Sequence, residues 1–364
     1  MEINSIIESM GVYLPKRCLS TKEAIAGCIV KPAVDLEELT GIKNRAIVGE
    51  NEYAIDLAVK AIDKCFSISK YQPNDIDMIV CPNLSRFNGK KWEYWFEPST
   101  PIKLRQHFDF KNAISFNVSN ACAGMFTAIQ VLDAYIKAGW IRRGLVVCGE
   151  WVTHLATNAQ KEISSPIDPQ FASLTIGDSA VALILEGTKD TDKGFKFIDV
   201  ITVAEHCKLC IGGPSTKEHG GYSMRTESSL MHKIGVPLSI KQLTWVMKEI
   251  GWDGEHQHFL IPHQTASRAI KSFGKEMNKE IGSPKYSTET NMVDNIAQRG
   301  NTATTTHFVA LWDFINKGII ESGSNLLLAI QASGIILGVA AYTLDDLPKR
   351  IINSEKNIQE QNCK

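Results

Sequence analysis

Residues 135–148 read YIKAGWIRRGLVVC, which is the end of an amphipathic helix, a glycine cap and a continuous apolar strand. The same pattern recurs in the second half of the chain, where residues 314–330 read FINKGIIESGSNLLLAI and Phe314 matches Tyr135. A strand without alternation is expected where helices cover both faces of a sheet. Because a repeat constrains the architecture before any single motif does, the two stretches predict a duplicated α/β fold.

The repeat extends in both directions from these stretches. Upstream, the strand end VCPN at 80–83 matches LIPH at 260–263, at a spacing only one position longer than that of the first match. Downstream, each copy closes with one more apolar strand, at 180–185 and 339–344. Each copy therefore reads strand, helix, strand, helix, strand, strand. This order predicts a layered core with helices inside and outside, and an active site where the copies meet.

The repeat also sets the expected domain boundaries. We expect an N-terminal half at 1–190, a C-terminal half at 191–346 and a polar, frayed tail at 347–364. The segment 205–235 is rich in glycine and lacks periodicity, so it is expected to be a loop. The apolar run 326–344 is interrupted by glutamine, serine and glycine, which favours two buried strands over a membrane span.

Composition limits the class of protein. The 364 residues carry 39 basic and 40 acidic side chains, so the basic excess that nucleic-acid binding needs is absent. The nine cysteines are an odd number and lie mostly in apolar runs, which indicates free thiols in a reducing cytoplasm. The first residues also lack the pattern of a signal peptide. One CxxC, Cys207 to Cys210, is weak evidence for a metal, and none is predicted.

Cys122 is the first candidate for chemistry. It lies in SNACAGM, between the apolar strand 114–118 and the helix that leads into residue 135. A thiol at a helix N-terminus feels the positive end of the helix dipole, which lowers its pKa and favours the nucleophilic thiolate. A buried cysteine without a chemical role is the alternative. The shift that matches residue 135 with residue 314 pairs Cys122 with Asn301, which is expected to begin the equivalent helix.

Two further residues strengthen this candidate. His263 follows the apolar strand 259–262, and Asn301 follows Gly300, whose lack of a side chain lets the backbone approach closely. Either residue alone could be an ordinary helix cap. A cysteine nucleophile, however, needs a partner that manages protons and donors that hold an oxyanion. The three residues together predict acyl chemistry, and His307 could line the same pocket or be a hydrogen-bonded core residue.

Four motifs give the chain a family resemblance. They are Asn-Ala-Cys-Ala-Gly at 120–124, Ile-Gly-Asp-Ser-Ala at 176–180, Pro-His-Gln at 262–264 and Gly-Asn-Thr at 300–302. In this order, and over residues 3–345, the chain resembles the thiolase superfamily and, within it, the ketoacyl-acyl carrier protein (ACP) synthase III branch. The resemblance implies an α/β fold of five layers, αβαβα, with mixed sheets in two duplicated halves. It also implies a homodimer without cofactor or metal, because phosphopantetheine arrives on the ACP or CoA substrate.

The resemblance assigns roles residue by residue. Cys122 would accept an acyl group from an acyl-ACP or acyl-CoA thioester. His263 and Asn301 would bind a second thioester and stabilise the enolate formed from it. The oxyanion would lie between the amide of Cys122 and one from the turn at Ser333 and Gly334, where the family usually has a run of glycines. The implied enzyme is an acyltransferase that forms a carbon–carbon bond by Claisen condensation.

Three segments bear on the substrate. Residues 37–41 stand where housekeeping members of the family have a Trp and an Arg around the CoA adenine. Arg268 matches a basic position that family members use near the carrier's phosphate. Its alternative interpretation is a solvated charge on a helix. Glu97, in FEPST at 96–100, resembles the Glu-Pro-Ser/Thr element of head-to-head condensing enzymes, α-pyrone synthases and dialkylresorcinol ketosynthases. In these enzymes a glutamate, which often reaches the pocket of the partner subunit, removes a proton from the α-carbon of an acyl chain. A carboxylate is a suitable base only if burial raises its pKa towards neutrality, and the aromatic residues of 92–96 could supply such surroundings. A surface glutamate without this role is the alternative.

The leading hypothesis is therefore a ketosynthase of specialised lipid or polyketide-type biosynthesis, with a malonyl or β-ketoacyl thioester as its second substrate. Three alternatives stay open. The first is a housekeeping ketoacyl-ACP synthase III that primes fatty-acid synthesis. The second is an enzyme that transfers the acyl group to oxygen or nitrogen. The third is a non-catalytic partner subunit of a ketosynthase heterodimer.

Overall fold

Two central sheets organise the molecule. The computed structural model describes residues 3–90, 92–252 and 256–362, and in it the first sheet has the strand order β1-β9-β8-β4-β7 and the second β10-β15-β14-β13. The first sheet consists of β1 (Asn4–Tyr13), β4 (Met78–Cys81), β7 (Ile114–Asn117), β8 (Arg143–Glu150) and β9 (Ser179–Thr188). The second consists of β10 (Gly194–Thr202), β13 (Phe259–Pro262), β14 (Asn325–Ala332) and β15 (Ile336–Thr343). Both sheets are mixed, with parallel β4–β8 and β13–β14 pairs beside antiparallel ones.

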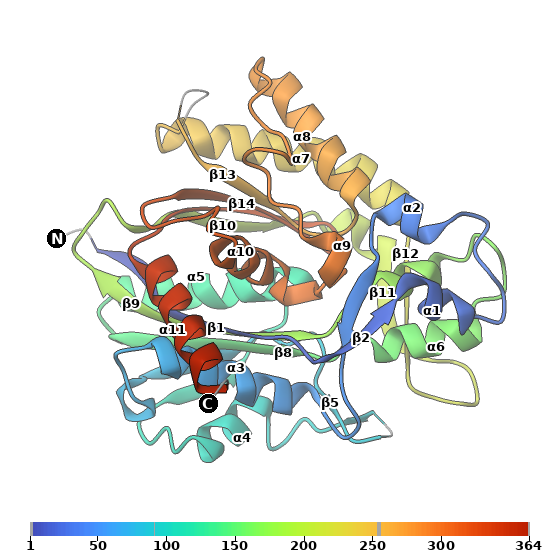
Figure 1. Cartoon of the computed structure of the whole chain (residues 1–364), viewed down its shortest axis with the longest axis horizontal. Helices are drawn as coiled ribbons and strands as arrows, with labels where there is room; N and C mark the ends of the chain where they lie inside the picture. The colour runs from blue at the N-terminus through green and yellow to red at the C-terminus, as the bar shows by residue number, and fades with distance from the viewer. Residues whose placement is uncertain (1–2, 91, 253–255, 363–364) are drawn as a thin grey trace.

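Helices separate and cover the two sheets (Figure 1). The layers are formed by α5 (Gly124–Lys137) and α10 (Thr306–Asn316) between the sheets, α3 (Ala54–Ile68) and α4 (Thr100–His107) outside the first, and α7 (Ser228–Glu249) and α8 (Ser267–Ile281) outside the second. The predicted five-layered αβαβα fold is confirmed.

Short elements gather at the end of the sheets where the site lies, at the right of Figure 1. They are α1 (Thr21–Ala26), α2 (Leu36–Thr40), α6 (His154–Glu162), α9 (Ile296–Arg299), β2 (Arg17–Ser20), β3 (Asn44–Ile47), β5 (Phe87–Asn88), β6 (Glu93–Tyr94), β11 (Cys210–Pro214) and β12 (Tyr222–Thr226). The prediction of a loop at 205–235 is wrong, because β11 and β12 form an antiparallel hairpin there. No residue of either strand is buried, and the only alternation is the short one of Tyr222 and Met224 in β12, which does not stand out in a glycine-rich segment.

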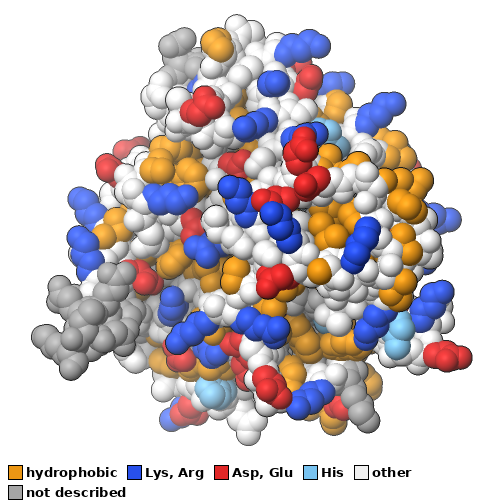
Figure 2. Space-filling view, turned by 45° about the vertical axis from the view of Figure 1, so that its right-hand side comes forward, with side chains coloured by type: hydrophobic (Ala, Val, Ile, Leu, Met, Phe, Trp, Pro, Cys, Tyr) orange, Lys and Arg blue, Asp and Glu red, His pale blue; other side chains and the backbone are white. Residues whose placement is uncertain are grey.

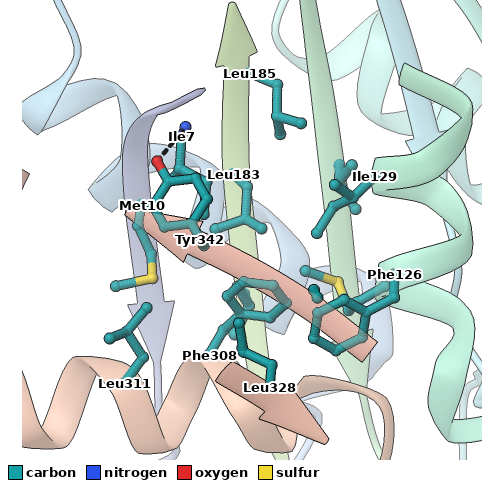
Figure 3. Close-up of a cluster of buried hydrophobic side chains, with 14 of the residues drawn as sticks. Ile7, Met10, Phe126, Ile129, Leu183, Leu185, Phe308, Leu311, Leu328 and Tyr342 are labelled. Carbon is teal, nitrogen blue, oxygen red and sulfur yellow. Dashed lines mark hydrogen bonds between the residues drawn. The ribbon is translucent and has the colours of Figure 1, made fainter. Parts of the chain in front are cut away.

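One core joins the two halves. Phe126 of α5 and Phe308 of α10 stack with ring centroids 5.4 Å apart, between buried side chains of both sheets (Figure 3). The amide of Ile7 in β1 donates a 2.8 Å hydrogen bond to the hydroxyl of Tyr342 in β15 (Figure 3). The expected division at residue 190 falls between β9 and β10, but the halves pack as one unit.

The internal symmetry of the structure differs from the sequence match at one place. The 3₁₀ turns η2 (Ala121–Ala123) and η5 (Ala303–Thr305) precede α5 and α10, and each begins at an alanine with positive φ, 46° and 51°. The helix α5 has 14 residues and α10 has 11. The two turns are therefore farther apart in the sequence than the two glycines that follow the helices. The constant shift found in the sequence aligns these glycines but not the turns. The predicted pairing of Cys122 with Asn301 is therefore wrong, and the counterpart of Cys122 is Thr304.

The C-terminal end of the described chain is helical. Residues predicted to be a frayed tail form α11 (Leu347–Asn362), in which Leu347 and Ile351 are fully buried. Arg350 on the same helix lies 3.9 Å from the carboxylate of Glu8 in β1. Two apolar positions four residues apart anchor the helix to the core, a signal that the polar composition of the segment conceals.

The long apolar run behaves as predicted. Residues 326–344 form most of β14 and all of β15, joined by a turn in which Gly334 has a φ of 75°. In the described ranges, no helix combines the length and the hydropathy that a bilayer crossing requires.

Candidate active site

Cys122 lies in the turn between β7 and α5. The positive φ of Ala121 bends the chain sharply before it, and the turn faces a cavity. The backbone amides of Cys122 and Ser333 lie close enough to its sulfur to lower the pKa of the thiol. The structure therefore brings together the two amides that the sequence proposed as oxyanion donors, with the first from Cys122 itself and the second from the turn after β14.

Burial controls the protonation of this thiol. The pKa of Cys122 is raised to about 12, mainly by burial and to a smaller extent by Cys210 and Glu150, while the amides of Ser333 and Cys122 act in the opposite direction. The sequence predicted a pKa lowered by the helix dipole, and that prediction is wrong because loss of solvent outweighs the dipole. A thiol with a raised pKa needs a neighbouring base before it can act as a nucleophile.

His263 supplies a neutral imidazole beside the cavity. It follows β13, it is 7% exposed, and its amide donates a 3.1 Å hydrogen bond to the carbonyl of Ala329. Burial, with the nearby His307, lowers the pKa of His263 to about 3, although the side chain of Asn301 acts in the opposite direction. The ring is therefore uncharged at neutral pH and can accept a proton.

His307 is a buried core residue rather than part of the cavity wall. Its Nε2 lies 2.9 Å from the carbonyl of Ala329, the same carbonyl that binds the amide of His263. The two imidazole rings are 5.6 Å apart. Of the two interpretations that the sequence left open, the hydrogen-bonded structural one is confirmed.

Hydrogen bonds from residues of both halves of the chain fix the position of Asn301. Its amide donates to Thr175 and its carbonyl accepts from Gly177, each at 2.9 Å. The side-chain Oδ1 accepts a 2.9 Å hydrogen bond from the amide of Ala303, which leaves the NH₂ group for the site. A Cβ at Gly300 would lie 2.8 Å from the Thr175 carbonyl, so only glycine fits before Asn301.

The Ile-Gly-Asp-Ser-Ala motif organises the walls around these residues. The fully buried carboxylate of Asp178 accepts hydrogen bonds from the amides of Val48, Val152 and Thr153, at 2.8–2.9 Å, and from the Thr153 hydroxyl. Val152 in turn lines the cavity. Asp178 therefore supports the cavity wall from behind, whereas Ile176 of the same motif lines the cavity itself.

A cavity of about 910 Å³ joins the predicted residues. Cys122, His263, Asn301, Arg268 and Ser333 all line it. Its volume is near the upper end for small-molecule sites, and most of its other lining side chains are apolar. The arrangement can hold an acyl chain with its carbonyl carbon at the Cys122 sulfur.

Glu97 is not brought to this cavity within one chain. Its side chain is exposed and accepts a 3.1 Å hydrogen bond from the amide of Ser99. The neighbouring Trp95 and Phe96 are 54% and 78% exposed. The expected apolar surroundings of Glu97 are therefore absent from the single chain, because this segment projects from the surface.

Arg268 and the CxxC lie near the cavity mouth. Arg268 forms a 3.2 Å ion pair with Glu38, and both side chains are mainly exposed, so the pair adds little stability. Cys210 lines the cavity beside Cys122, whereas Cys207 is exposed. Within the described ranges, no three His, Cys, Asp or Glu side chains are arranged to hold a metal ion.

Sequence reasoning missed Glu150, the last residue of β8. It is fully buried, and it is one of the charged groups that act on the Cys122 thiol. A signal was present, because an acidic residue two positions after the apolar run at 145–148 is unusual unless it has hydrogen-bond partners.

Comparisons with known proteins agree with this geometry. The family model for 3-oxoacyl-ACP synthase III matches residues 116–204, and that for its C-terminal part matches 247–344. The β-ketoacyl-ACP synthase III of Allorhizobium ampelinum is 26% identical over 92% of this chain and 98% of its own. That of Brucella canis is 24% identical over the same shares.

Solved structures share the fold. Xanthomonas campestris OleA has a TM-score of 0.79 at 19% identity and covers 93% of this chain and 96% of its own. The Aquifex aeolicus 3-oxoacyl-ACP synthase III has a TM-score of 0.75 at 22% identity over 93% and 99%. Fold, family models and cavity define a condensing enzyme of the thiolase superfamily, an acyltransferase that forms carbon–carbon bonds. The chain belongs to the 3-oxoacyl-ACP synthase III family.

Proposed function

We propose that the enzyme joins two acyl groups in specialised lipid or polyketide-type biosynthesis, using Cys122 as the acyl carrier. One observation carries the proposal: a single cavity is lined by Cys122, His263 and Asn301, which come from three separate loops in both halves. The two half-reactions predict ping-pong kinetics.

In the first half-reaction, the Cys122 sulfur attacks the carbonyl carbon of an acyl thioester. The thiol proton passes to the neutral His263 and then to the departing carrier thiolate, so the imidazole ends the step uncharged. The amides of Cys122 and Ser333 hold the developing oxyanion. The products are an acyl-Cys122 thioester and a free carrier thiol.

In the second half-reaction, a malonyl or β-ketoacyl thioester becomes the carbon nucleophile. The NH₂ group of Asn301 and the imidazole N–H of His263 donate to its thioester oxygen as the enolate forms. Loss of carbon dioxide, or removal of an α-proton by Glu97, generates the carbanion. It attacks acyl-Cys122, a carbon–carbon bond forms, and the Cys122 thiolate leaves. The thiolate takes up the α-proton that Glu97 removed or, after decarboxylation, a proton from solvent.

An ACP is the proposed donor carrier. Exposed Arg268, Lys271, Lys275 and Lys279 follow one face of α8 away from the cavity mouth, which fits an acidic carrier domain. Beside the mouth, Glu38 of α2 pairs with Arg268, so α2 offers no positive charge to CoA. The face that carries α2 is otherwise mixed, with basic, acidic and hydrophobic side chains interspersed (Figure 2). The free thiols of the described chain favour the cytoplasm as its compartment.

A homodimer would complete the site. β7 is an edge strand whose outer hydrogen bonds are open to a partner, and Ile114 on it is 60% exposed. Trp95 and Phe96 add apolar surface close to Glu97. An interface over these residues would bury the segment that projects from one chain and could direct Glu97 into the pocket of the partner.

Acyl loading tests the proposal directly. We expect incubation with a panel of acyl-ACP and acyl-CoA thioesters to add one acyl mass at Cys122, measured by intact and peptide mass spectrometry. The chain length that loads fastest identifies the first substrate. If Cys122 stays unmodified with every thioester, the chain is a non-catalytic partner subunit and the proposal is wrong.

The role of Glu97 has a separate test. In Glu97→Ala, we expect acyl loading to stay within about threefold of wild type and condensation to fall by about 10²-fold or more, because a general base is lost. Glu93→Ala is the matched control, because Glu93 is an exposed glutamate in β6, four residues before Glu97.

Mixed dimers decide in which subunit Glu97 acts. A dimer of one Cys122→Ala chain and one Glu97→Ala chain should regain up to roughly half of the wild-type activity if Glu97 acts across the interface. If Glu97→Ala condenses malonyl-ACP as fast as wild type, the proposed role of Glu97 is wrong, and this result favours the housekeeping alternative.

A further inference from the structure

Gln331 is a polar side chain of the cavity that neither half-reaction uses. It stands near the end of β14, where every other residue from 326 to 332 is apolar. It lines the same cavity as Cys122, His263 and Asn301. Its NH₂ group is shielded from solvent and has no hydrogen-bond acceptor within the described ranges. A buried donor without an acceptor costs free energy, so this position favours a ligand that brings an acceptor.

The position of Gln331 on β14 relates it to both steps of the reaction. Two residues before it, the carbonyl of Ala329 accepts the 3.1 Å hydrogen bond from the His263 amide. Two residues after it, Ser333 supplies the amide that acts on the Cys122 thiol. At the rise of a strand, each of these groups is roughly 7 Å from Gln331 along the chain. Gln331 therefore stands on the segment that serves both the acyl-carrying and the thioester-binding residues.

The surroundings of Gln331 leave room for a ligand. The parallel pairing of β13 with β14 ends at Ala329, so no described strand lies beside Gln331 on that side. On the other side it pairs with Leu337 of β15. A Cβ on Gly235 of α7 would lie 3.9 Å from a methyl group of Leu337, and both residues line the cavity. The neighbours are therefore apolar or lack a side chain, and the cavity supplies the open space.

The other donors beside Cys122 are already assigned to substrate oxygens. In the first half-reaction the amides of Cys122 and Ser333 hold the oxyanion. In the second, Asn301 and His263 hold the thioester oxygen. A simple acyl thioester offers no further oxygen near the reacting carbons. The NH₂ group of Gln331 therefore fits a second substrate that has an oxygen on C3, the second carbon beyond the thioester carbon.

Charge distinguishes a ketone on C3 from the carboxylate of a malonyl group. Among the described residues that line the cavity, Arg268 at the mouth is the only lysine or arginine, and Asp168 and Glu227 line it as well. His263 is neutral, because burial lowers its pKa to about 3. A carboxylate buried without a cation is costly, whereas a ketone needs only a donor such as an amide NH₂ group. The cavity therefore favours the ketone.

We propose that Gln331 binds the 3-oxo group of a β-ketoacyl second substrate by donating a hydrogen bond from its NH₂ group. The inference rests on the proposed function and narrows its second substrate from malonyl or β-ketoacyl to β-ketoacyl. The proton on C2 is removed, by Glu97 in the proposed function, and the electron pair that it leaves spreads over the thioester oxygen and the C3 oxygen. Asn301 and His263 hold the first of these oxygens, and Gln331 holds the second.

Gln331→Met tests the inference, because methionine is a similarly long, unbranched side chain that cannot donate a hydrogen bond. Enzyme loaded at Cys122 is given 3-oxoacyl-ACPs of graded chain length, saturated acyl-ACPs of the same lengths, or malonyl-ACP, and mass spectrometry measures the condensed product. We expect kcat/KM for the 3-oxoacyl-ACPs to fall by about 10²-fold, the usual effect of removing one donor to a developing oxyanion. Acyl loading, and any condensation of the other second substrates, is expected to stay within about threefold of wild type.

Three results would overturn the inference. The first is condensation of the 3-oxoacyl-ACPs within about twofold of wild type. The second is an equal fall with every second substrate, because Gln331 would then act on the carrier arm that they share or on the fold. The third is a fall with malonyl-ACP alone, which would assign Gln331 to the carboxylate. Thr226→Val is the matched control, because it removes a hydroxyl from the same cavity and keeps the shape, and it is expected to condense 3-oxoacyl-ACPs within about threefold of wild type.

The wild-type enzyme decides the question if Gln331→Met does not fold. We expect it to condense the best 3-oxoacyl-ACP at least about tenfold faster than malonyl-ACP. Normal loading of Cys122 followed by condensation of malonyl-ACP but of no 3-oxoacyl-ACP overturns the inference and leaves the proposed function standing. A lack of acyl loading at Cys122 overturns the proposed function itself, so the two failures are distinguishable.

Discussion

In Cys122→Ala, condensation falls by at least about 10⁴-fold, because no acyl-enzyme can form. If the carbanion arises by decarboxylation, this variant still releases carbon dioxide from a malonyl thioester, since Asn301 and His263 act on the second substrate without Cys122. Release of labelled carbon dioxide and formation of the condensed product, measured in parallel, separate the two events.

The outcome also assigns the chemistry of the second half-reaction. If Cys122→Ala releases carbon dioxide without condensation, the second substrate is of the malonyl type. If neither the wild type nor Cys122→Ala releases carbon dioxide, the result supports α-proton removal by Glu97. Cys210→Ala is the matched control, because this cysteine lines the same cavity and is expected to retain condensation within about threefold. Condensation by Cys122→Ala at the wild-type rate would show that another residue carries the acyl group.

The architecture was predictable because it depends on local patterns. The apolar runs of β8, β14 and β15 and the glycines after α5 and α10 are visible in sequence, and they sufficed for a duplicated, layered fold. The true correspondence of the two turns was not visible, because α10 is shorter than α5 and the sequence match holds only at the ends of the helices. Likewise, two buried residues hold α11 to the core within a segment that is otherwise polar.

The site was predictable in its residue types and less so in its electrostatics. Cys122, His263 and Asn301 stand in short motifs beside predicted strands, so their convergence could be expected from the repeat and the resemblance. The protonation of Cys122 could not, because it depends on burial and on Glu150 and Cys210, which are distant in sequence. The surroundings of Glu97 could not be predicted either, because its segment lies on the surface of the single chain.

Substitutions of Asn301 and of His263 are expected to impair different steps of the reaction. Asn301→Ala should load Cys122 within about threefold of the wild-type rate and lose about 10²- to 10³-fold in condensation, the usual effect of removing one donor to an oxyanion. His263→Ala should lose both steps, because it also removes the base that receives the Cys122 proton. Rapid-quench mass spectrometry of acyl-Cys122, together with product formation, measures the two steps separately.

The pH profile sharpens this separation. Burial lowers the pKa of His263 to about 3, so the imidazole is neutral, and able to accept a proton, at every pH above that value. Acyl loading should therefore show no acidic limb from His263 above about pH 4, and any fall towards lower pH must come from other groups or from unfolding, which circular dichroism detects. An acidic limb near pH 6.5 in folded protein would mean that His263 has the pKa of an exposed histidine and that its burial in the free enzyme does not persist in solution.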